Sequence, residues 1–243
     1  MRNYISVAIL AIAGILCFWI LNNAYKYKFR AAETISVTGL AEKDFVSDQI
    51  VWTGNYSRKT MDLKLAYTML KEDESKIRSY LKAKGITDNE MVFSAVSIDK
   101  DFTTRYDTDG KQIGMDFTGY NLKQNVTVDS RDIDKVEKIS REVTELIQSG
   151  IEFNSSSPSY YYTKLSELKI DLLAKASADA KQRAETIAKN SGSGLGSIKK
   201  ATMGVFQITG KNANEDYSYG GVFNTSSKNK TASITTKIDF ALD

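Results

Sequence analysis

The side chains that most often perform nucleophilic, acid–base or metal chemistry are nearly absent from this chain of 243 residues. It contains no histidine and a single cysteine, Cys17. A catalytic relay through histidine, a disulfide within the chain, and a zinc or haem site built from histidines or several thiolates are therefore excluded. We expect no metal and no cofactor. The net charge of +3 is too balanced to indicate nucleic-acid binding.

Carboxylates are the remaining groups that could support catalysis, and they form three clusters. These are Glu72 to Glu74, Asp99 with Asp101, and Asp132 with Asp134. A glycosidase needs two carboxyl groups that face each other ~5–10 Å apart across a cleft, which sequence spacing does not establish. The first cluster lies in a lysine-rich helical pattern where Glu72 and Lys76 are four residues apart, so we expect a solvated helix face.

Two short segments resemble ligand-binding loops but fit simpler structures better. Asp107 and Asp109 fall at calcium-ligand positions of an EF-hand, yet the first ligand would be Arg105, so we predict a hairpin turn through Gly110. The glycine-rich segment 192–196 follows a helical pattern, whereas a phosphate-binding loop precedes its helix. We therefore predict that this segment ends the helix.

Clustered aromatic residues are the best candidates for a binding surface. Exposed tyrosine and phenylalanine side chains stack on sugars or anchor protein interfaces. The simpler alternative is that alternate tyrosines pack on a sheet while their neighbours face water. The possible interface residues are Tyr160, Tyr161, Tyr162, Tyr217, Tyr219 and Phe223.

Half of these aromatic residues lie in a polar segment at 209–230, which is rich in asparagine, serine, glycine and lysine. A loop of this length is uncommon in a compact domain and is usually functional or disordered. Two alternatives stay open: the loop is disordered, or it becomes ordered on a partner or within an oligomer.

The N-terminal residues indicate where the protein resides. Residues 5–21 are uncharged and apolar, near the lower limit of ~17 residues for a membrane-spanning helix. We expect residues 1–24 to form an uncleaved signal anchor, with a cleaved signal peptide as the alternative, and residues 25–33 to form a spacer. The positive-inside rule conflicts with export, because three basic residues follow the apolar run: Lys26, Lys28 and Arg30.

The patterns from residue 45 to 162 predict a ferredoxin-like half. The expected order is strand 45–57, helix 60–84, strand 91–102, strand 114–128, helix 133–149 and strand 151–161. In this strand-helix-strand-strand-helix-strand order both helices pack on one face of an antiparallel sheet. Ser130 is the expected cap of the second helix. Pro158 indicates an edge position for the last strand, because proline cannot donate to the ladder.

The remaining patterns predict a second half built from both ends of an α+β domain. A short strand at 34–40 would join an alanine-rich helix at 164–190 and strands at 199–208 and 231–242. The alanines indicate that this helix lies close to a neighbouring backbone. These elements could extend the first sheet, but we favour a second sheet and helix subdomain made of residues 34–40 and 163–243.

A series of short motifs runs through these elements. The motifs are Ile35 to Gly39, Gly85-Ile86, Gly119-Tyr120, Gly150-Ile151, the alanine-rich helix, Leu195-Gly196 and the alternating strand Ile234 to Leu242. In this order they resemble the SIMPL-domain family of bacterial cell-envelope proteins over residues 34–243. The resemblance implies a periplasmic or surface domain, a tendency to form homo-oligomers and a loose link to oxidative-stress tolerance. It implies no catalytic residue.

Together, the residues and the resemblance predict a non-enzymatic envelope protein that self-associates or binds an unknown protein partner. The resemblance favours export over the charge rule, so we expect the domain in the periplasm or outside the cell, held by a membrane helix at 5–21. The alternative is a carboxylate-based enzyme acting on envelope glycans, which needs converging acids with raised pKa values in a cleft. Because Cys17 lies within the anchor, a stress role would not use cysteine switching.

Overall fold

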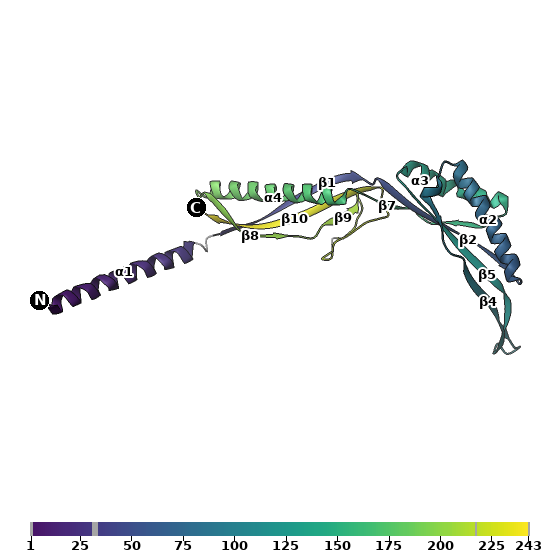
Figure 1. The fold of residues 1–243 in the computed structure, drawn as a ribbon, viewed down its shortest axis with the longest axis horizontal. Coiled ribbons are helices and arrows are strands. Elements are labelled where there is room, and N and C mark those ends of the chain that lie inside the picture. Colours follow the sequence, from purple (N-terminus) through teal and green to yellow (C-terminus); the bar gives the residue numbers. More distant parts are fainter. Residues whose placement is uncertain (1, 31–33, 217, 243) are drawn as a thin grey trace.

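The computed structural model describes residues 2–30, 34–216 and 218–242. The molecule is elongated: an N-terminal helix leads to a sheet with one long helix, and a second sheet with two helices lies beyond it (Figure 1). Both sheets are antiparallel, and the described residues form four α-helices. The predicted α+β class is confirmed.

The N-terminal segment forms one continuous helix, α1 (Arg2–Arg30). Its described apolar side chains are largely uncovered, with Phe18 73% and Leu21 68% exposed. Within the described residues, no helix combines the length and the apolar character that crossing a membrane requires. The membrane span predicted for residues 5–21 is therefore not confirmed.

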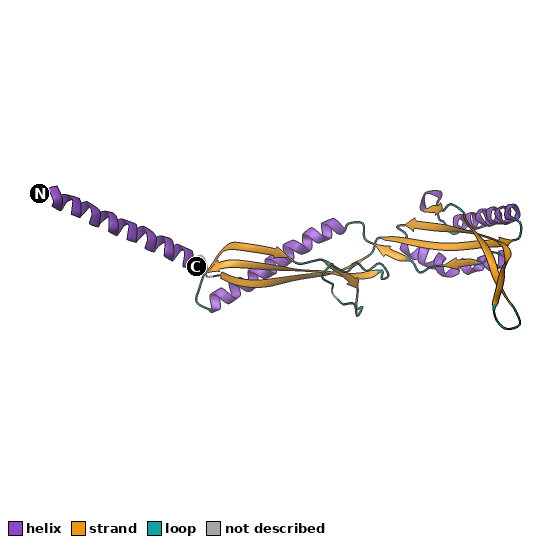
Figure 2. Ribbon diagram, turned by 90° about the horizontal axis from the view of Figure 1, so that it is seen from below, coloured by secondary structure: helices purple, strands orange, loops and turns teal. Residues whose placement is uncertain are grey.

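One half of the domain, which we call the terminal half, combines both ends of the chain after α1. Its elements are β1 (Thr34–Val46), α4 (Leu165–Asn190), β8 (Leu195–Met203), β9 (Gln207–Gly210) and β10 (Asn229–Leu242). The central strand β10 pairs with β1 on one side and with β8 and β9 on the other (Figure 2). These strands form a sheet of their own and do not extend the first sheet.

β1 is longer than the strand predicted at 34–40, and this moves the boundary between the two halves. Its alternation continues beyond Gly39, because Val37, Ala41 and Phe45 all point into the cores of the terminal half. The pairing with β10 extends over the full strand and ends at Val46. The ferredoxin-like half therefore begins at Gln49 rather than at residue 45.

Helix α4 lies close against β1, as the alanine pattern predicts, because the residues between them are small. Ala176 and Ala180 are fully buried. A Cβ atom on Gly39 would lie only 2.1 Å from the carbonyl oxygen of Ala176. The contact is also polar, since the Leu40 N–H donates to the Asp179 carboxylate at 2.8 Å. α4 therefore approaches the strand at backbone distance, where only glycine fits.

The ferredoxin-like half has the predicted order of strands and helices. Its elements are β2 (Gln49–Thr60), α2 (Leu63–Ala83), β3 (Met91–Phe93), β4 (Ser97–Tyr106), β5 (Gln112–Ser130), α3 (Ile133–Glu142), β6 (Phe153–Ser155) and β7 (Ser159–Tyr161). The sheet order is β3–β5–β2–β6, with β4 also paired to β5 and β7 also paired to β2. β2 and β5 are thus the central strands.

Two predicted strands of this half are each divided. The strand expected at 91–102 is interrupted between β3 and β4, where the Ser94 N–H donates to the Asn125 carbonyl oxygen at 2.9 Å. The strand expected at 151–161 is split into β6 and β7 around Pro158. Both pieces pair only with β2 at the end of the sheet order, so the edge position indicated by the proline is confirmed.

The second helix of this half also differs from its prediction. α3 ends at Glu142, and a 3₁₀-helix (Val143–Ser149) continues the path to Gly150. Asp132, not Ser130, caps α3, since its carboxylate accepts the Lys135 N–H at 3.2 Å. The Ser130 hydroxyl instead accepts the Asp132 N–H and donates to Glu90 at 2.5 Å. Ser130 thus holds the backbone that precedes α3 in place.

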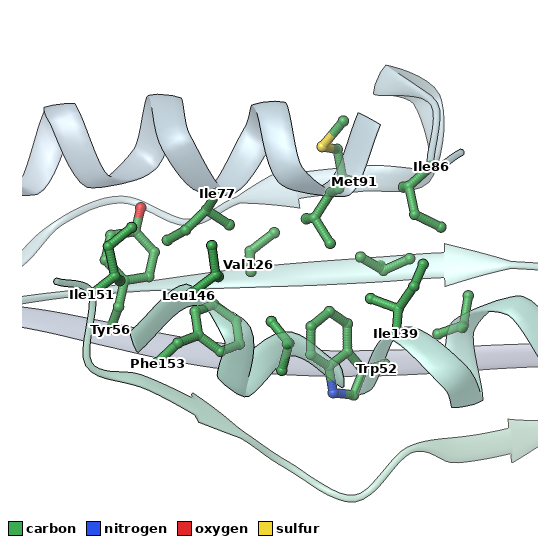
Figure 3. Packing of buried hydrophobic residues seen from close by; sticks show 14 of the residues in the cluster. Trp52, Tyr56, Ile77, Ile86, Met91, Val126, Ile139, Leu146, Ile151 and Phe153 are labelled. Atoms are coloured by element: carbon green, nitrogen blue, oxygen red, sulfur yellow. The ribbon is translucent and has the colours of Figure 1, made fainter. Parts of the chain in front are cut away.

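The core of the ferredoxin-like half is built from large side chains (Figure 3). Trp52 and Tyr56 on β2 are 0% and 1% exposed and lie between the sheet and the helices. Their polar atoms are bonded: the Trp52 indole N–H donates to Ser155 Oγ at 3.0 Å, and the Tyr56 hydroxyl donates to Gln124 Oε1 at 2.7 Å. Burial raises the pKa of Tyr56. The tyrosine is therefore a structural residue.

Polar contacts join the two halves, each of which has its own hydrophobic core. Asp48, between β1 and β2, accepts the N–H and the hydroxyl of Thr163, each at 2.7 Å. Lys228 of the terminal half forms ion pairs with Asp134 and Glu137 on α3, at 2.5 and 3.8 Å. The halves are thus separate hydrophobic units with a polar junction.

Candidate interaction surface

Asp73 departs most from the expectation for its cluster, because it lies in the interior rather than on a solvated helix face. It is 2% exposed, and its carboxylate accepts two hydrogen bonds from Arg58, at 2.5 and 2.8 Å. Arg58 also donates to the Gly150 carbonyl oxygen at 2.7 Å. The solvated-face prediction is wrong for Asp73, which joins α2 to β2 and to the end of the second helix.

The other two carboxylate clusters form ion pairs with lysines. The pairs are Asp99–Lys123 at 3.1 Å, Asp101–Lys59 at 2.9 Å, Asp132–Lys135 at 3.0 Å and Asp134–Lys228 at 2.5 Å. The hydrogen bond from Lys135 lowers the pKa of Asp132, which is opposite to the raised pKa of a general acid. In the described part of the chain, no group of three potential ligands among His, Cys, Asp and Glu is arranged to hold a metal ion.

The two loop-like segments form the turns predicted for them. Asp107 accepts the backbone N–H groups of Asp109 and Lys111 at 3.0 and 2.8 Å, and Gly110 has a φ of +76°, so this segment is a hairpin turn. Gly192 also has a φ of +76° and ends α4. The segment at Asp107 is therefore a turn between two strands and not a calcium loop. The segment at Gly192 follows its helix, whereas a phosphate-binding loop precedes one.

The three consecutive tyrosines lie at the junction between the halves and pack against the protein itself. Tyr160 donates its hydroxyl to Glu137 at 2.9 Å, and burial raises the pKa of Tyr160 to about 12. Tyr162 contacts the ring of Phe45, with centroids 4.8 Å apart. Tyr161 is half-buried in β7. The packing alternative therefore describes Tyr160 and Tyr162.

The polar segment packs on the terminal half through a network around a buried lysine. Lys230, 2% exposed, donates to the carbonyl oxygen of Asn224, and the Asn224 amide donates to Glu215. Glu215 also accepts the Gly210 N–H at 3.2 Å. Burial lowers the pKa of Lys230. These bonds tie the segment to β9 and β10.

The aromatic residues of this segment differ in their positions. Tyr217 lies outside the described residues. Tyr219 is fully exposed and borders a groove of about 710 Å³, which is also lined by Leu40, Val205 and Ile234. Phe223 is 52% exposed and bridges to Ile208 of β9. Of the predicted interface residues that the structure describes, Tyr219 is therefore the one that presents its whole side chain to solvent.

A second exposed surface lies on the ferredoxin-like half, where β4 and β5 extend beyond the rest of the sheet as a two-stranded arm (Figure 1). We define the arm as residues 97–121. β2 accompanies β5 only as far as the Thr60–Tyr120 pair, so the outer part of the arm has no third strand. The arm therefore carries side chains away from both cores.

One face of the arm carries a row of apolar side chains, which we call the apolar stripe. Its residues are Ile98, Phe102, Tyr106, Met115, Phe117 and Tyr120. Phe102 and Phe117 pack edge to face with ring centroids 5.7 Å apart, and Phe117 packs similarly on Tyr120 at 5.1 Å. Phe102 nevertheless remains 50% exposed, and Met115 remains 60% exposed. The stripe is thus ordered by its own contacts but is not covered.

The stripe continues into a groove at the base of the arm. This groove, of about 570 Å³, is lined by Ile98 and Tyr120 of the arm and by Leu63 and Tyr67 at the start of α2. Contiguous exposed apolar surface of this kind marks interaction sites in soluble domains. The sequence already shows that Ile98, Phe102 and Tyr106 share one face of a strand. The same spacing of apolar residues is also found in buried strands, so it does not indicate that the face is exposed.

No curated protein matches the chain. The model of the SIMPL family, described as a protein of unknown function (DUF541), matches residues 35–238. This match covers both halves, from β1 through the polar segment to β10. The resemblance seen in the motifs is therefore confirmed, and the chain belongs to the SIMPL (DUF541) family.

Proposed function

We propose that the protein is a non-enzymatic component of the cell envelope that self-associates through the apolar stripe of its arm. The observation that carries this proposal is an ordered row of aromatic and aliphatic side chains in which Ile98, Phe102, Tyr106 and Met115 are each at least 50% exposed. Burial of apolar surface provides most of the driving force for association, and large aromatic side chains dominate binding energies at interfaces. A second copy supplies a stripe of the same character.

Native mass in solution tests this proposal. We expect the full-length chain, kept soluble in mild detergent, to form a dimer or larger oligomer by light scattering. Replacing two stripe residues in the double variant Phe102→Ser, Met115→Ser should shift the mass toward the monomer. Val92→Ser is the matched control, because Val92 is 66% exposed in β3, outside the arm. A monomeric wild type, or a double variant of unchanged mass, would contradict the proposal.

The envelope location is supported by the family resemblance and by the exposed apolar side chains of α1. Phe18, Trp19 and Leu21 are each more than 60% exposed, which suits contact with lipid or detergent. Cell fractionation tests this part of the proposal: we expect the protein with the membrane fraction, and replacement of Phe18 and Leu21 by serine should release it. Recovery of the wild type with cytoplasmic proteins would contradict it.

A link to oxidative stress is proposed on similar grounds and would involve methionine. Met115 in the stripe is 60% exposed, and oxidation of methionine to the sulfoxide makes the side chain polar. Peroxide treatment should therefore weaken self-association of the wild type more than that of Met115→Leu. Equal effects on the two proteins would count against this link.

A further inference from the structure

We propose that β4 pairs antiparallel with β4 of a second copy, about a two-fold axis at Phe102. This inference deepens the proposed self-association and rests on it, because it specifies which edge and which register join the copies. The resulting interface is symmetric, so each contact away from the axis occurs twice, once in each direction. A continuous sheet would then run from one arm into the next.

The outer edge of β4 is free and regular. Among the described residues β4 pairs only with β5, which leaves the backbone groups on its other side available to a second strand. The register between β4 and β5 shifts twice, and the extra residues, Thr118 and Ile113, both belong to β5. β4 itself runs from Ser97 to Tyr106 without an inserted residue. Bulges that commonly block edge pairing are therefore absent from the described edge of β4.

The face of β4 that carries the stripe is self-complementary around Phe102, and Lys100 on the same face lies opposite Thr104 of the second copy. In the proposed register Phe102 lies opposite Phe102 of the second copy, and Ile98 lies opposite Tyr106. All three side chains are half or more exposed, at 50%, 54% and 60%. Aromatic pairs and aromatic–aliphatic pairs across strands are among the stabilising cross-strand contacts. The pairing would thus place the two apolar stripes side by side on one face of the continuous sheet.

The polar face of β4 is complementary in charge in the same register. Asp99 lies opposite Arg105 of the second copy, and by symmetry this contact occurs twice. Within each chain Asp99 already pairs with Lys123 at 3.1 Å, and Arg105 approaches Asp116 at 3.8 Å. Pairing would join these into a row of alternating charge across four strands: Lys123, Asp99, then Arg105 and Asp116 of the second copy.

Neighbouring registers bring like charges together. An axis at Asp101 places this carboxylate opposite itself, and an axis at Lys100 places two ammonium groups opposite each other. An axis at Thr103 forms an Asp101–Arg105 contact but sets Asp99 opposite Asp107. Like charges directly opposite on paired strands are destabilising. Charge therefore selects the axis at Phe102.

Disulfide cross-linking tests the register directly. Cys17 is the only cysteine, so Cys17→Ser gives a thiol-free background. In this background Phe102→Cys should form a dimeric disulfide under mild oxidation, because opposite residues lie within the ~4.4–6.8 Å Cα range of a disulfide. Thr104→Cys is the matched control on the same face: its two copies would be separated by four residues, about 13 Å, and should not cross-link. Mixed Ile98→Cys and Tyr106→Cys proteins should cross-link to each other.

Charge exchange gives a second test that does not depend on thiols. Asp99→Arg should raise the dissociation constant about tenfold, because two arginines would face each other at each end of the interface. The double variant Asp99→Arg, Arg105→Asp should restore association. Equal cross-linking of the Phe102 and Thr104 variants, or no restoration by the double variant, would overturn the register. A wild-type protein that is monomeric by mass would overturn the proposed function as well, whereas a stripe-dependent dimer without these results overturns the register alone.

Discussion

The two halves of the molecule pack helices on a sheet in different ways: one uses large side chains and the other uses small ones. In each half an antiparallel sheet is covered on one face by helix. The ferredoxin-like half fills the space with Trp52, Tyr56 and Phe153, whereas the terminal half brings α4 onto β1 through Gly39 and buried alanines. The first half should therefore be most sensitive to removal of atoms, and the second to their addition.

Trp52→Ala should have the largest effect of the changes considered. Removing a fully buried aromatic side chain leaves a cavity and costs about 3–5 kcal/mol of unfolding free energy. The change also leaves Ser155 without the indole donor. Trp19→Ala is the matched control, because Trp19 in α1 is 62% exposed. Hydrogen exchange should accelerate across residues 49–161 and change less in α4; uniform acceleration would show that the halves unfold as one unit.

The ion pairs of the two halves differ in burial, and removing one acid from each sharpens the comparison. Asp73→Ala should destabilise the protein by about 2–4 kcal/mol, because the Arg58 guanidinium would remain in a largely enclosed site without its partner. Asp171→Ala removes the pairs with Lys43 and Lys175, in which Asp171 is 40% exposed, and should cost ~0–1 kcal/mol. Urea unfolding measures both; similar values would contradict the assigned difference in burial.

Adding one methyl group to each half tests sensitivity to extra atoms. Gly39→Ala should cost about 1–3 kcal/mol, because the new Cβ meets the backbone of α4, which cannot move without shifting the helix. Gly54→Ala should cost less, since its Cβ meets the outer end of the buried Phe153 ring, and displacing one side chain moves fewer atoms than displacing a helix. Gly220→Ala is the control, with only the Ser218 hydroxyl nearby at 3.9 Å. A larger loss for Gly54→Ala would reverse the comparison.

Periodicity predicted the elements of both halves well, because alternation and helical spacing report directly which residues face a core. The order of strands and helices, the close approach of α4 and the edge position at Pro158 all follow from such local signals. The end of β1 did not, because Lys43 and Asp44 interrupt the apolar alternation before Phe45 resumes it. That strand is extended by its pairing with β10, which is distant in sequence.

The interaction surface was harder to predict than the fold, because exposure depends on which part of a sheet the helices cover. Ile98 and Phe102 have the period of any half-buried strand, yet neither belongs to the core beneath α2 and α3. Asp73 illustrates the converse. Its neighbours in sequence are charged, yet the contact with Arg58 from β2 buries it.

The smallest expected effect is the loss of stability at low pH, which can be compared between one carboxylate of each half. The Ser130 hydroxyl, followed by the Thr87 N–H, lowers the pKa of Glu90 in the ferredoxin-like half, and the Leu40 N–H, followed by Arg183, lowers the pKa of Asp179 in the terminal half. A carboxylate whose pKa is lowered on folding stabilises the protein above its unfolded pKa, and this contribution is lost as the pH falls through the folded value.

Both halves should consequently lose stability below about pH 4, near the unfolded pKa of these carboxyl groups. Glu90→Gln and Asp179→Asn should each make the unfolding free energy depend less steeply on pH in acid. The change in slope should be no more than the uptake of one proton produces. Glu90 receives its bonds in a partly buried site, whereas Asp179 is on the surface of α4 and is screened by water. The change in slope should therefore be greater for Glu90→Gln in urea titrations between pH 7 and 3, and a greater change for Asp179→Asn would place the stronger polar contact at the interface of α4 and β1.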